Sequence, residues 1–81
     1  MRTVVLYGRD GCCLCDEARE IIERVRARRA FALREFDIES DAAVHREYLE
    51  RIPVVTIDGV EAFQFVVDED EFERRVAEAR P

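Results

Sequence analysis

The feature that most restricts the fold is an amphipathic segment, from about Cys13 to Arg29, that lies between two strand-like blocks. The block before it, Thr3–Tyr7, is β-branched and apolar, which predicts a strand buried on both faces. The block after it, Phe31–Ile38, alternates apolar and charged residues and predicts a second strand. Within the segment itself, the apolar residues keep the spacing of one helical face: Leu14, Ala18, Ile21, Ile22 and Val25. This order predicts two parallel strands joined by a helix in a right-handed crossover.

The middle of the chain predicts a short helix followed by a hairpin. Ser40 is in the place of a helix cap, and the helix is expected to run to about Arg51, where a proline soon stops it. Asp58-Gly59 is typical of a hairpin turn between a third strand, Val54–Ile57, and a fourth strand, Val60–Val67. The residues expected on the inner side of the helix are Val44, Tyr48, Leu49 and Ile52.

The end of the chain predicts a third helix. Asp68 and Glu71 have the spacing of a capping box that opens it, with Arg80 at its end. Its inward residues are expected to be Phe72, Val76 and Ala79. The element order β-α-β-α-β-β-α predicts an α/β fold in which helices flank a four-stranded mixed sheet. We expect a single domain over residues 1–81.

The balance of charge argues against two classes of partner. The chain has 81 residues, of which 40% are charged and 48% are apolar, so it can build a small core under a well-solvated surface. Its net charge is −6, whereas nucleic acids and anionic membranes attract proteins that are rich in Lys and Arg. We therefore expect no binding to nucleic acid or membranes. The chain is also expected to be a monomer.

The amino-terminal sequence carries no export signal. The apolar run Thr3–Tyr7 is too short for a secretory signal, and no segment reaches the roughly 20 apolar residues of a membrane span. We therefore expect a cytoplasmic protein, in a compartment where thiols stay reduced. Three cysteines within four residues then predict redox catalysts or metal ligands rather than a disulfide scaffold.

Cys12 and Cys15 form a Cys-x-x-Cys pair where the first loop enters the first helix. Residues i and i+3 of a helical turn lie on one side, so the two Cα atoms can come within disulfide range. Cys12 also faces the free N–H groups at the helix start, which lower a thiol pKa. We therefore expect Cys12 to attack a substrate disulfide and the more sheltered Cys15 to resolve the mixed disulfide.

Cys13 lies between these two residues and admits three interpretations. Our first choice is a bystander that points to solvent; the others are a third thiol that shuffles disulfides and a metal ligand. The main rival function is soft-metal binding of Cu(I) or Zn by Cys12, Cys13 and Cys15, with His45 as an optional fourth ligand. The helix between the second and third strands argues against the copper-chaperone order. An iron–sulfur cluster shared by two chains and a non-catalytic binding module are further alternatives.

Two motifs carry a resemblance to a known family. The segment Leu6–Ala18 resembles the active-site segment of glutaredoxins, and is especially similar to short bacterial glutaredoxin-like proteins with Cys-x-Leu-Cys-Asp-Glu-Ala. Arg51-Ile52-Pro53-Val54-Val55 resembles the cis-proline segment of the same family. The resemblance covers essentially the whole chain and implies the thioredoxin fold.

The resemblance also implies roles for individual residues. It implies that the chain is a dithiol–disulfide oxidoreductase with Cys12 as nucleophile and Cys15 as resolving thiol. It implies that Ile52, Pro53 and Val54 shape the substrate groove, with Pro53 in cis and backbone groups pairing with the substrate. Arg9 falls where glutathione-using members carry a basic residue that meets a glutathione carboxylate.

The chain departs from the glutaredoxin pattern at the end of the hairpin. The usual Gly-Gly pair is absent, and the sequence runs through Phe63–Val67 instead. We expect Phe63 and Phe65 to share a strand face in core or hairpin packing. We expect no bound cofactor, and two classes of reductant: glutathione as co-substrate, or a protein dithiol donor or reductase such as thioredoxin reductase. The expected substrates are disulfides of proteins or small molecules, acted on by a mild reductase.

Overall fold

The computed structural model describes residues 2–77 and has the predicted order of elements. The elements are β1 (Thr3–Gly8), α1 (Cys13–Arg26), β2 (Ala32–Asp37), a 3-10 turn (Ile38–Ser40), α2 (Ala42–Tyr48), β3 (Val54–Ile57), β4 (Val60–Gln64) and α3 (Glu69–Ala77). None of the helices in residues 2–77 combines the length and apolar character that a membrane crossing requires.

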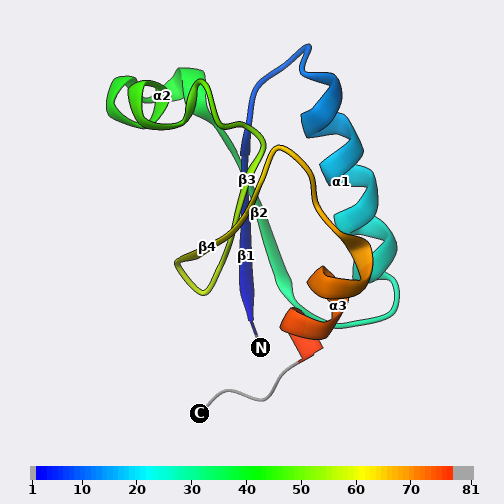
Figure 1. The fold of residues 1–81 in the computed structure, drawn as a ribbon. Helices are drawn as coiled ribbons and strands as arrows, with labels where there is room; N and C mark the ends of the chain where they lie inside the picture. Colours follow the sequence, from blue (N-terminus) through cyan, green and yellow to red (C-terminus); the bar gives the residue numbers. More distant parts are fainter. Residues whose placement is uncertain (1, 78–81) are drawn as a thin grey trace.

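The four strands form one mixed sheet in the order β2-β1-β3-β4. β1 and β2 are parallel, as the crossover predicted, while β3 runs antiparallel to both β1 and β4. Figure 1 shows α1 and α3 side by side on one face of the sheet, and α2 on the other side near the end of β1. The predicted α/β class and four-stranded mixed sheet are confirmed.

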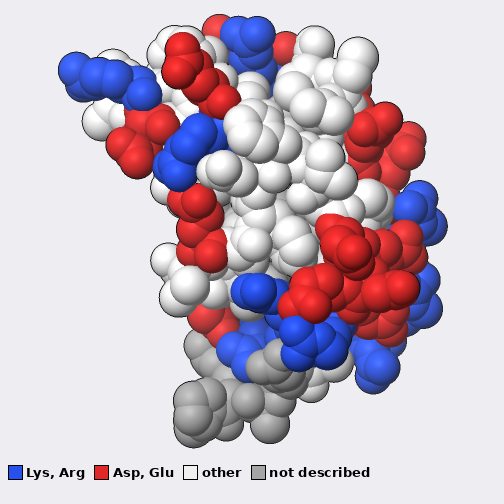
Figure 2. All heavy atoms as spheres, viewed as in Figure 1, with Lys and Arg blue, Asp and Glu red and all other residues white. Residues whose placement is uncertain are grey.

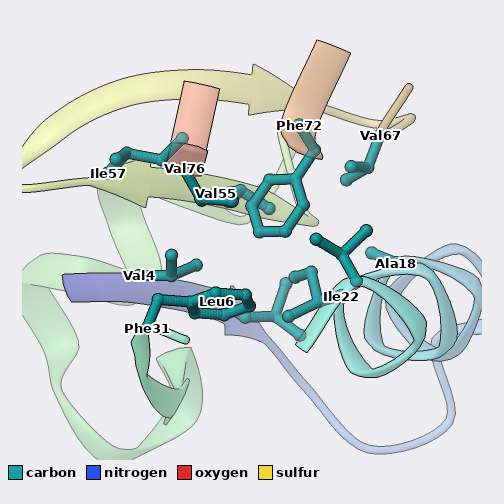
Figure 3. Close-up of a cluster of buried hydrophobic side chains, with 11 residues drawn as sticks. Val4, Leu6, Ala18, Ile22, Phe31, Val55, Ile57, Val67, Phe72 and Val76 are labelled. Atoms are coloured by element: carbon teal, nitrogen blue, oxygen red, sulfur yellow. The ribbon is translucent and has the colours of Figure 1, made fainter. Parts of the chain in front are cut away.

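The main core lies between the sheet and the α1–α3 layer. Phe72 of α3 is fully buried and meets Phe31 edge-on, with ring centroids 5.6 Å apart. Figure 3 shows Phe72 reaching between Val55 of the sheet and Ile22 of α1. One aromatic side chain thus joins both helices to the sheet.

The burial of β1 and α1 differs in part from the expectation. In β1, Val4 and Leu6 are buried, but Val5 and Tyr7 on the opposite face are only half-buried, because just one short helix lies on that side. In α1 the buried stripe consists of Cys15, Ala18, Ile22 and Val25. Leu14, which was expected to face inward, is 40% exposed.

The helix ends also differ from the expectation. The cap of α2 is Asp41 rather than Ser40, and its Oδ1 accepts hydrogen bonds from the Ala43 and Val44 N–H groups at 2.9 and 3.1 Å. α1 ends at Arg26, three residues early. α2 ends at Tyr48, three residues early, because the Arg51 N–H donates to the Tyr48 carbonyl at 2.8 Å in a tighter turn. Leu49, which was expected on the inner side of this helix, is exposed.

The fourth strand ends at Gln64, three residues before its expected end. Phe65 has φ +68° and the Val66 N–H donates to the Gln64 carbonyl at 2.8 Å, which makes Phe65 the centre of a γ turn. Phe63 packs against Phe72 while Phe65 is 43% exposed, so the prediction that the two share a strand face is wrong. The Phe65 N–H still donates to the carbonyl of Pro53, the residue before β3, at 2.9 Å, so the chain turns away only after this last bond of the antiparallel pairing.

The start of α3 follows the prediction. Asp68 Oδ1 accepts a hydrogen bond from the Glu71 N–H at 3.0 Å, as a helix cap does, and both Phe72 and Val76 are buried. The other two residues named for this helix, Ala79 and Arg80, lie outside the described residues.

Candidate functional site

Cys12 is the cap of α1. The loop after β1 turns at Gly11, whose φ of +78° favours glycine, and delivers Cys12 in an extended conformation at the helix start. The Cys12 Sγ accepts a hydrogen bond from the Cys15 N–H at 3.3 Å. The sulfur therefore occupies the place that a serine or aspartate oxygen takes in an ordinary cap, against the free N–H groups of the helix.

The three cysteines differ in exposure. Cys12 is half-buried, Cys13 is exposed and Cys15 is fully buried, and all three are free thiols. The expected order of access, with Cys12 outside and Cys15 inside, is what the structure has. Among residues 2–77, no three cysteine, histidine or acidic side chains lie in an arrangement that could hold a metal ion.

Cys15 lies in a small apolar cluster of its own. Its buried partners are Ile38 and Ile52, and Cys12 packs against the edge of the same cluster. Burial is the first cause that raises the pKa of the Cys15 thiol to about 11, and the hydrogen bond with Cys12 is the second. The backbone N–H of Arg9 acts in the opposite direction by donating to the sulfur. The inner thiol is thus kept neutral at moderate pH.

The segment Ile52–Val54 lies beside the cysteines. The Ile52–Pro53 peptide bond is cis, as the resemblance implied. Ile52 brings this segment against Cys15, and the side chains of Pro53 and Val54 are themselves fully buried. The tertiary structure therefore joins the two motifs, which are about 40 residues apart in the sequence, at one end of the sheet.

Arg9 is exposed on the β1–α1 loop, at the edge of a cavity of about 220 Å³ near the carboxyl ends of β1 and β2. The charged residues that line this cavity are Arg9, Asp10, Arg19, Glu35 and Asp37. Arg19 is already engaged, because its guanidinium bonds Glu35 and also Asp16 at 2.9 Å. The lining does not include the Ile52–Val54 segment.

An aromatic group near the site was not assigned from the sequence. Tyr7 contacts Phe36 and Tyr48, with ring centroids 5.5 and 4.8 Å apart. The Arg51 guanidinium lies over the Tyr48 ring at 4.9 Å. Tyr7 and Tyr48 both pack against the Cys15 cluster, so they support the site from the α2 side. Helical spacing had placed Tyr48 on the inner side of its helix, but nothing in the sequence indicated its contact with Tyr7.

Comparisons with known proteins place this arrangement in a family. Residues 3–79 match the family model described as Glutaredoxin-like domain (DUF836). Among curated proteins, no sequence matches the chain. Protein Ne2328 from Nitrosomonas europaea, solved in solution by NMR, superposes with a TM-score of 0.80 at 27% identity, covering 94% of this chain and 92% of that protein.

Two further solved structures agree with this assignment. Target protein XcR50 from X. campestris is 30% identical, with a TM-score of 0.77, over 95% of this chain and 99% of that one. A mutant thioredoxin from Halobacterium salinarum superposes with a TM-score of 0.72 over 99% of this chain and 78% of that one; at 19% identity it shows the fold alone. The chain therefore belongs to the glutaredoxin-like domain family and has the thioredoxin-like fold.

Proposed function

We propose that this domain is a dithiol–disulfide oxidoreductase that uses Cys12 as nucleophile and Cys15 as resolving thiol. The observation that carries the proposal is the position of Cys12, which is half-buried at the start of α1 with its sulfur accepting the Cys15 N–H at 3.3 Å. A sulfur that carries negative charge is favoured there by the N–H groups and by the dipole of the helix. Family membership supports a thiol redox role of this kind.

The reaction has two thiol–disulfide exchanges. In the first, the Cys12 thiolate attacks one sulfur of a substrate disulfide, a Cys12–substrate disulfide forms, and the other substrate sulfur leaves as a thiolate that takes a proton from water. In the second, Cys15 loses its proton and attacks Cys12, which forms the Cys12–Cys15 disulfide and releases the second substrate thiol. The substrate gains two electrons and the protein dithiol loses them.

The neighbouring segments provide the substrate groove in this proposal. Ile52 lies in the cysteine cluster and Pro53 follows it through the cis bond, and backbone groups of Ile52 and Val54 would pair with the substrate. Arg9, on the exposed loop before Cys12, would meet a carboxylate of an acidic substrate or of glutathione. Glutathione and a protein dithiol can each return two electrons to the Cys12–Cys15 disulfide, so both are used as reductants in the test.

The test is a redox titration of the purified, metal-free protein in dithiol/disulfide buffers, read by thiol trapping and mass measurement. We expect one reversible two-electron transition that links Cys12 to Cys15. Cys13→Ser is expected to leave this transition in place, whereas Cys12→Ser is expected to abolish it. Cys15→Ser is expected to accumulate a mixed disulfide on Cys12.

The outcome that contradicts the proposal is the absence of any reversible pair in the wild-type protein. Protection of the thiols only after Cu(I) or Zn is added would support the metal-binding alternative instead. If the Cys12–Cys15 disulfide of the Cys13→Ser protein is reduced by a protein dithiol but not by glutathione, the reductant is a protein dithiol.

A further inference from the structure

Gly8 is the last residue of β1 and is buried against Cys15. A Cβ atom at this position would lie 2.9 Å from the Cys15 Sγ and 3.2 Å from the Cys15 Cβ. The first distance is shorter than real Cβ contacts, so any side chain at residue 8 would have to displace Cys15 or the strand. Glycine at this position leaves room for the sulfur.

The other two glycines have a different reason for being glycine. Gly11 and Gly59 have φ of +78° and +83°, and an added Cβ would meet nothing within 4 Å at either position. Gly8 does not have a positive φ, so its backbone conformation is open to any residue. Space beside Cys15 is therefore the one demand for glycine that the structure places on residue 8.

Cys15 has little freedom to move away from such a side chain. It is fully buried, with Ile38 and Ile52 against it, and α1 is held to the sheet by buried Ala18 and Ile22. A cysteine side chain has a single rotatable bond to its sulfur, so a shift changes the direction in which the sulfur points. Close packing would transmit the displacement to the start of α1.

The place of this sulfur matters for the second exchange step. The backbone N–H of Arg9, the residue after Gly8, donates to the Cys15 sulfur and favours its charged form. The N–H of Cys15 in turn donates to the Cys12 sulfur at 3.3 Å. A movement of the Cys15 backbone would therefore affect both sulfurs. A displaced Cys15 sulfur would lose the Arg9 donor and the line of attack on Cys12.

We propose that Gly8 is a positioning residue for the resolving thiol: its missing side chain is the space that holds the Cys15 sulfur beside the Arg9 N–H and one helical turn from Cys12. The kinetic part of this inference rests on the proposed oxidoreductase function. The contact between Gly8 and Cys15 does not, and the two parts are tested separately.

The kinetic test compares Gly8→Ala with Gly59→Ala, both in a Cys13→Ser background. An excess of an aromatic disulfide reacts in a single turnover, and the release of the first and second aromatic thiols is followed by absorbance. The first release reports the attack of Cys12, and the second reports the attack of Cys15. Gly8→Ala is expected to slow the second release on the order of tenfold, with the first changed by less than about twofold. Gly59→Ala adds a methyl far from Cys15 and is expected to change neither release.

The structural test is a double-mutant cycle on the reduced protein, which needs no redox activity. The unfolding midpoint in urea is measured for wild type, Gly8→Ala, Cys15→Ala and the double variant. The loss caused by Gly8→Ala is expected to be smaller in the Cys15→Ala background, because the sulfur that meets the new methyl is gone. If Gly8→Ala alone fails to fold, recovery of folding in the double variant supports the proposal equally.

The two tests address the Gly8–Cys15 contact and the positioning role of Gly8 separately. Additive losses in the cycle would overturn the contact, and an unchanged second release in a folded Gly8→Ala protein would overturn the positioning role. A wild-type protein that reduces no disulfide would instead defeat the oxidoreductase proposal, while the cycle would still report whether Gly8 holds the space for Cys15.

Discussion

Two thiols that are one helical turn apart experience different surroundings in this domain. Cys12 caps the helix and is partly open to solvent, whereas Cys15 is enclosed by Ile38, Ile52 and the end of β1. The chemical difference comes from position along one turn, since both residues are cysteines on the same element. The ionisation of Cys15 is therefore a direct probe of its enclosure.

The pH dependence of stability should reveal the buried Cys15. Its pKa in the folded protein is raised from 9.0 to about 11, so below pH 9 the thiol is protonated in both the folded and the unfolded chain. As pH rises from 9 towards 11, the unfolded chain loses this proton first and gains stability relative to the folded one. We expect the free energy of unfolding of the reduced protein to fall by about 2 kcal/mol over this range because of Cys15 alone.

The measurement is urea unfolding of wild type and Cys15→Ala between pH 7 and pH 10.5, with a phosphine reductant present. Burial also raises the pKa of Tyr48, but this tyrosine is present in both proteins and cancels in the difference. A difference between the two proteins that is flat across this range would contradict the prediction.

Phe65 offers a second prediction for a single residue, because its φ of +68° suits glycine better than any residue with a Cβ. Removing the ring as Phe65→Gly and as Phe65→Ala separates the backbone from the side chain. Phe65→Gly is expected to be more stable than Phe65→Ala by about 1 kcal/mol, measured by urea unfolding.

The matched control is Phe63, which lies in strand β4 and has no positive φ. There the usual preference should hold, and Phe63→Gly should be less stable than Phe63→Ala by about 0.5–1 kcal/mol. The same order of Ala and Gly at both positions would show that the turn at Phe65 carries no backbone strain.

Charged side chains join the two helices that cover the core. Arg24 of α1 and Arg28, two residues beyond it, bond Glu69 of α3 at 2.9 and 3.0 Å, and Arg28 also bonds Glu73 at 2.8 Å. Arg29, just beyond α1, reaches Glu73 at 3.2 Å. Figure 2 shows the acidic side chains gathered over the α3 side of the molecule with basic ones around them. These pairs tie the end of α1 to the first turns of α3.

These ion pairs should make the stability of the protein depend on ionic strength and on pH. The arginines hold the pKa of Glu69 and of Glu73 below the ordinary value of 4.5. The contribution of these carboxylates is therefore present above pH 4.5 and is lost as pH falls through the lowered values. We expect Glu73→Gln to lower the melting temperature at pH 7 in dilute buffer, with the difference shrinking towards zero in 1 M NaCl, which screens exposed charges.

The matched control for Glu73→Gln is Glu17→Gln, an exposed acid near the start of α1. Its effect is expected to be smaller in dilute buffer. An effect of Glu73→Gln that is equally large at both salt concentrations would indicate packing rather than charge.

The whole molecule has two apolar clusters of unequal size. The larger one unites the sheet, α1 and α3, and the smaller one surrounds Cys15 at the end of β1. The larger cluster carries the stability of the fold, while the smaller one shapes the site. A small domain of this length has about 4–12 kcal/mol of total stability, so a single large loss from the main core is enough to unfold it.

Phe72 is the residue with which to test this division. It is fully buried and contacts Phe31 and Phe63, so Phe72→Ala is expected to cost about 3–5 kcal/mol and leave a large unfolded fraction. Phe72→Leu keeps most of the buried volume and should remain folded. The check is far-UV circular dichroism with urea titration; a Phe72→Ala protein as stable as wild type would contradict the prediction.

The local pattern of this sequence was sufficient for the element order, the hairpin turn at Asp58-Gly59 and the position of Cys12 at a helix start. Helical spacing, strand alternation, capping and turn residues act over a few neighbours, so one sequence displays them directly. The parallel pairing of β1 with β2 followed from the strand–helix–strand order, since parallel strands need such a crossover connection. The family resemblance supplied the cis bond before Pro53, which no local pattern would have required.

Only the tertiary structure decided which side of each element was covered. Leu14 faces solvent and Cys15 faces the core because the stripe that meets the sheet begins one residue later than the pattern suggested. Phe65 ends the strand in a turn with φ of +68°, although its N–H still bonds the carbonyl of Pro53, a residue twelve positions earlier. Gly8 matters through contact with a sulfur on the following helix. Each of these depends on distances between elements, and such distances exist only once the chain has packed.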